Sequence, residues 1–156
     1  MKTNLTGYSL TLFAAGACLA FAAPSSAAET DAPAITAAAE KFHTALAAGK
    51  SEEVMSLLQP DALVVEGGAV QTRAEYESEH LGEDIAYARA VPVKPLQVLV
   101  RQEGDTAWIT STFSVQGTFE GKPVNSLAAE TMVLTRTSGG WRIRAIHWSS
   151  HKASKS

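Results

Sequence analysis

The stretch Ala62-Leu63-Val64-Val65-Glu66-Gly67-Gly68 is an apolar run that ends in a carboxylate and two glycines. The apolar run predicts a buried strand from Ala62 to Glu66, and the glycines predict a turn directly after it. A glutamate that an apolar strand delivers, with no cation beside it in the sequence, is expected to have a raised pKa and to exchange a proton near neutral pH. A solvated strand end is the alternative interpretation of Glu66.

Two helices are predicted ahead of this strand. The first has an apolar stripe at helical spacing, with Asp31 as its N-cap and Gly49 as its end. The second starts at Ser51 and ends at Pro60, and its first turn contains acidic residues that suit the positive end of a helix.

A third helix is predicted after the strand. Thr72 and Glu75 have the spacing of a capping box, which predicts a helix from Arg73 to Leu81 that closes at the next glycine. Tyr76 and His80 lie four residues apart and therefore share one face of this helix.

Beyond Pro92 the pattern changes to strands separated by glycine-containing turns. Helices that precede an antiparallel sheet indicate an α+β domain, and a long curved sheet with helices over one face leaves a pocket between them. The predicted strands are Leu96–Gln102, Ala107–Thr118, Ser126–Thr137 and Trp141–Ser150.

The N-terminus has the pattern of a secretory signal. Lys2 precedes an apolar stretch from Leu10 to Ala23, and small residues follow as far as Ala28, where we expect cleavage. The apolar stretch is too short for a membrane span, so we expect no membrane contact in the mature form. The expected organisation is a signal peptide over residues 1–28, a single domain over 29–151 and a disordered tail over 152–156. The expected location is the periplasm or the medium.

Composition excludes several functions. The chain of 156 residues has a formal net charge of −3, and its basic residues do not cluster, so no nucleic-acid partner is expected. Its single cysteine, Cys18, lies inside the predicted signal, so the mature form is expected to contain no thiol. No phosphate loop, dinucleotide fingerprint or serine-nucleophile elbow is present, and no cofactor is expected.

Three stretches are similar to the nuclear transport factor 2-like superfamily, which includes SnoaL-like polyketide cyclases and ketosteroid isomerases. The resemblance implies a cone-shaped, curved antiparallel sheet, a half-barrel, with about three N-terminal helices that enclose a pocket. It also implies a homodimer through the outer face of the sheet. The stretches are Phe42-His43-Thr44-Ala45-Leu46-Ala47-Ala48-Gly49, Asp61 to Gly68, and Gly139-Gly140-Trp141-Arg142-Ile143 with His147-Trp148-Ser149.

The resemblance implies catalytic roles for three residues. Glu66 matches the proton-shuttling aspartate of ketosteroid isomerases, and Glu130 lies near the protonated aspartate that donates to a developing oxyanion. His80 matches a helix position that carries a tyrosine in some isomerases. Phe42 stands where the family has its oxyanion tyrosine, and because it has no hydroxyl it argues against steroid-type isomerisation.

The pocket lining is expected to include aromatic and sulfur-containing side chains. Alternation along the last strand leaves open whether His147 or Trp148 faces the pocket, and the resemblance favours His147. The other expected lining residues are Phe42, Tyr76, Trp108 and Met132.

Three functions remain open from the sequence. The first is binding of a small, largely apolar organic ligand by an exported domain. The second is acid-base catalysis as an isomerase, cyclase or dehydratase, with Glu66 as base and His80 or Glu130 as donor. The third is capture of copper or zinc by His80, Glu66 and His147, which are ligand types that these ions prefer.

Overall fold

The computed structural model describes residues 31–154, so the predicted signal peptide lies outside the described residues. The helices are α1 (Ala32–Ala48), α2 (Ser51–Leu57), α3 (Arg73–Glu75) and α4 (Leu81–Ala90), with a π-helical turn, Tyr76–His80, between α3 and α4. The strands are β1 (Leu58–Glu66), β2 (Ala69–Thr72), β3 (Val93–Glu103), β4 (Thr106–Phe119), β5 (Lys122–Thr137) and β6 (Gly140–Lys152).

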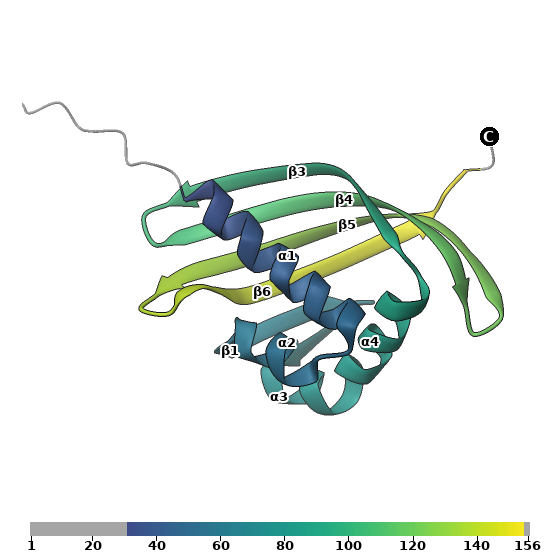
Figure 1. Cartoon of the computed structure of the whole chain (residues 1–156), viewed down its shortest axis with the longest axis horizontal. Coiled ribbons are helices and arrows are strands. Elements are labelled where there is room, and N and C mark those ends of the chain that lie inside the picture. Colours follow the sequence, from purple (N-terminus) through teal and green to yellow (C-terminus); the bar gives the residue numbers. More distant parts are fainter. Residues whose placement is uncertain (1–30, 155–156) are drawn as a thin grey trace, which may run out of the picture.

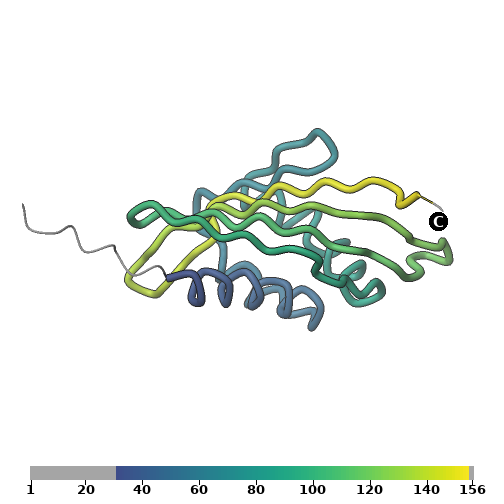
Figure 2. Tube along the Cα trace, turned by 90° about the horizontal axis from the view of Figure 1, so that it is seen from above, coloured from purple at the N-terminus to yellow at the C-terminus, as the bar shows by residue number. Residues whose placement is uncertain are grey.

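The six strands form one curled, unclosed sheet in the order β2-β1-β6-β5-β4-β3. The helices cover one face of this sheet, and α1 crosses the long strands on that side (Figures 1 and 2). The predicted α+β cone is therefore confirmed. None of the helices in residues 31–154 is long and apolar enough to cross a membrane.

Helix α1 follows the predicted apolar stripe and ends at Gly49, whose φ of 73° is a left-handed conformation that glycine adopts without strain. Asp31 occupies the N-cap position, but its side chain makes no capping hydrogen bond. Its carboxylate instead pairs with Arg136 and accepts a hydrogen bond from Trp141 Nε1 at 3.3 Å. The predicted side-chain cap is therefore wrong, because two partners distant in the sequence take up the carboxylate.

The junction between α2 and β1 differs from the prediction. Helix α2 ends at Leu57 and β1 begins at Leu58, so a helix as far as Pro60 is wrong. Strand β1 pairs with β6 in parallel, and the register shifts between Leu58 and Leu63. Pro60 lies in this irregular segment, where its missing N–H removes no regular ladder bond. The sheet is consequently mixed and not wholly antiparallel.

A short hairpin that was not predicted follows β1. Gly67 and Gly68 have φ values of 59° and 87°, which suit a tight hairpin turn, and β2 returns alongside β1. The capping box is confirmed, since the Thr72 hydroxyl accepts from the Glu75 N–H and the Glu75 carboxylate accepts from the Thr72 N–H. The predicted stop at Gly82 is wrong, because the chain continues through the π-helical turn into α4.

Strand β6 contains a bulge that decides which of its side chains face inward. Val133 pairs with Ala145 and Leu134 pairs with Ile143, which leaves Arg144 as the extra residue on β6. The strand also extends past the predicted start of the tail, since Lys152 pairs with Ser126.

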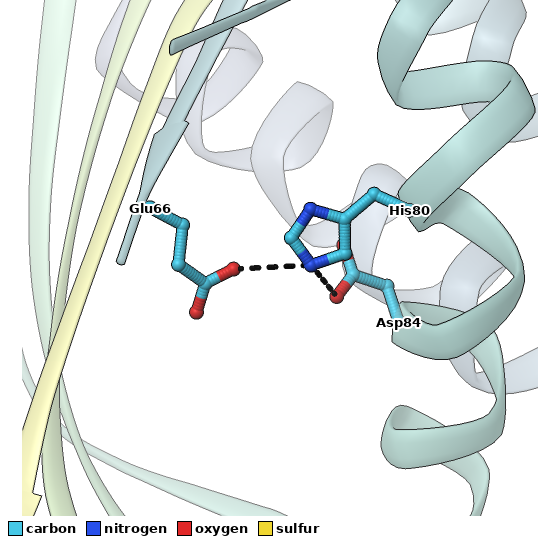
Figure 3. A group of neighbouring side chains, drawn as sticks. All are labelled: Glu66, His80 and Asp84. Atoms are coloured by element: carbon cyan, nitrogen blue, oxygen red, sulfur yellow. Dashed lines mark ion pairs between the residues drawn. The ribbon is translucent and has the colours of Figure 1, made fainter. Parts of the chain in front are cut away.

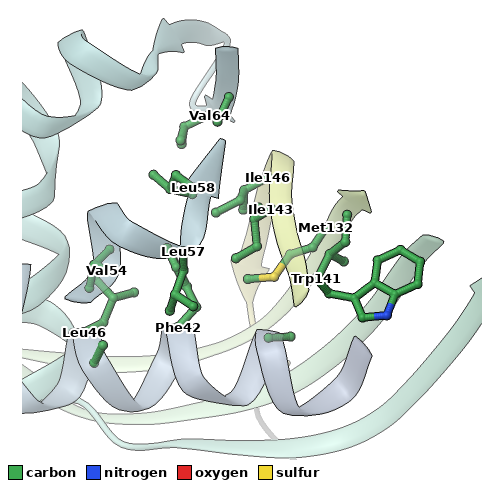
Figure 4. Close-up of a cluster of buried hydrophobic side chains, with 14 of the residues drawn as sticks. Phe42, Leu46, Val54, Leu57, Leu58, Val64, Met132, Trp141, Ile143 and Ile146 are labelled. Atoms are coloured by element: carbon green, nitrogen blue, oxygen red, sulfur yellow. The ribbon is translucent and has the colours of Figure 1, made fainter. Parts of the chain in front are cut away.

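The hydrophobic core fills one end of the space between the helices and the sheet (Figure 4). Side chains of α1 and α2 pack there against β1, β5 and β6. The fully buried side chains include Phe42, Val54, Val64, Met132, Leu134, Ile143 and Ile146. The opposite ends of β4, β5 and β6 do not belong to this core.

Candidate functional site

A cavity of about 860 Å³ lies between the helices and the sheet at the end away from the core. Residues of α1 and α4 line one side of it, and residues of β4, β5 and β6 line the other. Much of the lining is apolar or aromatic, as in Leu46, Tyr87, Val91, Phe113 and Phe119. A mostly apolar cavity of this volume is typical of a site for a small organic molecule.

Four of the predicted site residues line the cavity: Glu66, His80, Glu130 and Trp148. Of the two candidates on β6, Trp148 faces the cavity and His147 does not. The bulge at Arg144 turns His147 to the outer face of the sheet.

The remaining expected lining residues do not line the cavity. His147 and Trp108 are exposed on the outer face, so their predicted place in the pocket is wrong. Phe42, Tyr76 and Met132 are fully buried in the core beside the cavity, which corrects their expected place in its lining.

Glu66, His80 and Asp84 form a cluster on the cavity wall (Figure 3). Glu66 ends β1 just before the hairpin turn, His80 ends the π-helical turn, and Asp84 lies one turn further along α4. His80 Nε2 is 3.6 Å from Glu66 Oε2 and 3.6 Å from Asp84 Oδ1. π-helical turns are frequent at functional sites, and this one aims the imidazole at the two carboxylates.

Two further side chains orient this cluster. Gln71, on the unpredicted strand β2, places its Oε1 2.9 Å from His80 Nδ1. Because an amide oxygen only accepts, we assign the hydrogen to Nδ1, which leaves Nε2 as the nitrogen that exchanges a proton. The buried Tyr76 hydroxyl donates to Asp84 Oδ2 at 2.8 Å and fixes that carboxylate from behind.

Both carboxyl groups of the cluster hold protons more strongly than usual. Burial raises the pKa of Glu66, the negative charge of Asp84 raises it further, and His80 opposes these effects. Burial also raises the pKa of Asp84, while the Tyr76 hydrogen bond and His80 oppose the rise. The titration of Glu66 therefore depends on the charge of Asp84.

These raised pKa values predict how stability depends on pH. At pH values between the ordinary carboxyl pKa and the raised pKa of the folded state, the folded chain holds protons at Glu66 and Asp84 that the unfolded chain releases. The free energy of unfolding therefore falls as the pH rises between these two values. A Glu66→Gln, Asp84→Asn double variant removes both groups. We expect its free energy of unfolding, measured by urea denaturation from acidic to neutral pH, to decline less than that of the wild type. An equal decline would contradict the assignment.

Glu130 belongs to a second polar cluster. It is 2% exposed, and its Oε2 accepts hydrogen bonds from Trp148 Nε1 at 2.7 Å and from His43 Nε2 at 2.8 Å. Glu130 Oε1 has no hydrogen-bond partner among the described residues. Trp148 connects the two clusters, since its Nε1 donates to Glu130 and its ring centroid is 6.4 Å from that of Tyr76, which donates to Asp84.

The predicted site does not include three of these side chains. Asp84 has the helical i, i+4 spacing from His80, which is a signal that could have placed it in the site. Gln71 acts through a hairpin that was not predicted. His43 meets Glu130 across 87 positions of sequence, and no local pattern indicates that contact.

The same three-residue cluster has the composition of a metal site. Ligand atoms of Glu66, His80 and Asp84 lie within 4.8 Å of one another, and this is the one such group found in residues 31–154. The predicted ligand set of His80, Glu66 and His147 is therefore wrong in one member. Asp84 stands where His147 was expected, because His147 lies on the outer face of the sheet.

Comparison with known proteins identifies clear relatives. A family model for the SnoaL-like domain matches residues 35–152. The crystal structure of a proposed ketosteroid isomerase from Shewanella frigidimarina is similar with 33% identity and a TM-score of 0.71, over 74% of this chain and 94% of that one. A search of curated proteins gave no match.

Two more distant structures share the fold. A proposed dehydratase of the nuclear transport factor 2-like family from Streptomyces avermitilis has 25% identity and a TM-score of 0.65, over 79% of this chain and 97% of that one. The CaMKII hub of S. rosetta has 19% identity and a TM-score of 0.68, over 79% and 98%, and this likeness concerns the fold alone.

Proposed function

Because the chain belongs to the SnoaL-like domain family, within the nuclear transport factor 2-like superfamily, we propose that it binds a small, largely apolar organic molecule and moves protons on it with Glu66 and His80. The observation that carries this proposal is the Glu66–His80–Asp84 cluster on the wall of a mostly apolar cavity. Catalytic groups are commonly found where burial and neighbouring charges shift proton affinity inside a pocket.

The proposed chemistry starts at Glu66. Its carboxylate takes a proton from a carbon next to a carbonyl, and the electron pair moves onto the carbonyl oxygen. If a carbon–carbon double bond adjoins that carbon, return of the proton at the far end of the double bond gives an isomer. If instead a hydroxyl group leaves from the neighbouring carbon, the doubly protonated His80 gives it the proton on Nε2, water departs, and the proton that Glu66 took passes back to Nε2. Gln71 keeps the other ring nitrogen as a donor, so that Nε2 alone carries the exchanging proton.

Steroid-type isomerisation is not the form of this chemistry that we propose. Phe42 stands at the position of the family's oxyanion tyrosine, and it is both buried and without a hydroxyl. Tyr76 is also buried, and its hydroxyl is bound to Asp84, so it acts as a positioning residue. A missing oxyanion donor costs on the order of 100- to 1000-fold in rate.

The proposal can be tested without knowing the substrate. Small ketones and hydroxyketones are incubated with the protein in heavy water, and nuclear magnetic resonance follows deuterium entering their carbon positions. We expect at least one compound to exchange faster with the protein than with buffer. If no compound exchanges faster, and no compound in the same panel raises the melting temperature, the proposed function fails.

Metal capture is a second candidate function. The two side chains that hydrogen-bond to the outer atoms of the cluster, Gln71 and Tyr76, support it. Gln71 fixes the far nitrogen of His80, and Tyr76 fixes the far oxygen of Asp84, as outer partners do for metal ligands. Untagged protein equilibrated with copper or zinc should then retain one ion per chain, and Asp84→Asn should lose it. Retention well below one ion per chain would rule this candidate out.

We also propose that the protein is exported and that it forms a homodimer. Lys2, the apolar stretch that follows it and the small residues up to Ala28 support export to the periplasm or the medium. The outer face of the sheet exposes Leu63, Leu99 and Trp108, which supports a homodimer through that face.

A further inference from the structure

The charges that line the cavity select against an anionic ligand. Among the described residues, four carboxylates line it, those of Glu66, Glu83, Asp84 and Glu130. Two histidines line it as well, and the lining contains no lysine or arginine. Carboxylates that face a low-dielectric cavity focus a negative potential there, which attracts cations and repels anions.

Glu130 offers a specific place for a positive group. The side chain is almost completely buried, and both of its protein donors, Trp148 Nε1 and His43 Nε2, point at the same oxygen, Oε2. The other oxygen, Oε1, is buried and has no partner among the described residues. A buried acceptor without a donor is costly, and a ligand N–H that reaches it removes that cost.

The surroundings of Glu130 suit a cation that carries an apolar body. Trp148 and Phe113 line the cavity beside it, and aromatic faces attract organic cations. His43 packs edge-on against Phe113 and holds Glu130 Oε2, which leaves Oε1 as the carboxylate oxygen for the ligand.

We infer that the ligand of this cavity is a hydrophobic organic amine whose protonated nitrogen donates to Glu130 Oε1. This inference rests on the proposed function, because it names the class of molecule that the same cavity binds. In such a complex the apolar body lies along the apolar part of the lining, and the proton-transfer cluster at Glu66 faces another part of the same molecule. Glu130 thereby acts as an acceptor for the ligand.

Three probes that share one ring system test the inference: naphthylmethylamine, naphthylmethanol and naphthoate. Each is titrated into the full chain at neutral pH, and calorimetry gives its dissociation constant. We expect the amine to bind at least about tenfold more tightly than the alcohol, and naphthoate to bind most weakly. Glu130→Gln should remove the preference for the amine, whereas Glu103→Gln, an exposed carboxylate outside the cavity lining, should leave it unchanged.

The possible results separate failure of the amine inference from failure of cavity binding. Equal binding of amine and alcohol, or an amine preference that survives Glu130→Gln, overturns the inference and leaves cavity binding intact. If naphthoate binds more tightly than the amine, the inference is wrong even when the Glu130 variant does not fold. If none of the three probes binds, the inference is wrong, and the ketone panel decides separately whether the proposed function stands.

Discussion

Glu66→Gln is expected to slow proton transfer about 100- to 10,000-fold, the usual contribution of a positioned general base. Glutamine has nearly the shape of glutamate, but it cannot take up the proton. Glu66 lies at the hairpin turn, 3.6 Å from His80 Nε2, and its side chain is 41% exposed, so the substitution leaves the core untouched. The rate loss should therefore occur without loss of the fold.

The measurement is deuterium exchange into the best compound of the ketone panel, with wild type and variant at equal concentration. Glu103→Gln makes the same chemical change at an exposed position on β3, outside the cavity lining, and should exchange like the wild type. Near-ultraviolet circular dichroism checks that the variants are folded. An unchanged rate in Glu66→Gln would remove Glu66 from the mechanism.

Phe42→Ala is expected to lower the free energy of unfolding by about 3–5 kcal/mol, the usual cost of truncating a buried aromatic ring. The Phe42 side chain is 0% exposed and projects from α1 into the core (Figure 4). Its ring also contacts Trp148, with centroids 6.3 Å apart. The truncation consequently leaves a void beside the Trp148 ring, which lines the cavity, so ligand affinity should fall as well.

Urea denaturation measures the stability loss, and Leu96→Ala is the control. Leu96 is 57% exposed on β3, outside the cavity lining and outside the proposed dimer contact, so its truncation should change stability by less than about 0.5 kcal/mol. If Phe42→Ala cost no more than Leu96→Ala, α1 would not be held against the sheet in the way the structure shows.

The helices and strands could be predicted where a local pattern decides them. The apolar stripe of α1, the capping box at Thr72 and the glycine-containing turns on either side of β5 are properties of neighbouring residues, and each appears in the structure. The predictions are wrong where residues distant in the sequence determine the local structure. Arg136 and Trp141 take the Asp31 carboxylate away from its cap, and parallel pairing with β6 starts β1 two residues before Pro60.

The sequence predicts the part of the site that has a local pattern or a family position. Glu66 was recognisable because a charge at the end of an apolar strand has a local signature, and His80 because it matches a family position. The contacts that turn these two residues into a site are not local. Gln71 reaches His80 only because the hairpin folds β2 back, and Trp148 replaces His147 inside only because of the bulge at Arg144.

The raised proton affinity of Glu66 also has a cost for the fold. A carboxyl group that burial and a like charge disfavour when ionised does not stabilise the domain at neutral pH. Asp84 adds to this cost, although the Tyr76 hydroxyl reduces it. Such a pair of groups is expected where function, rather than stability, sets the choice of residue.

The most direct test of the account is the titration of the Glu66 carboxyl carbon by nuclear magnetic resonance, in the wild type and in Asp84→Asn. We predict a Glu66 pKa above the ordinary glutamate range in the wild type, because of burial and the Asp84 charge. Removal of that charge should lower the pKa in the variant. An ordinary Glu66 pKa that does not respond to Asp84→Asn would contradict the account and mark Glu66 as a solvated strand end.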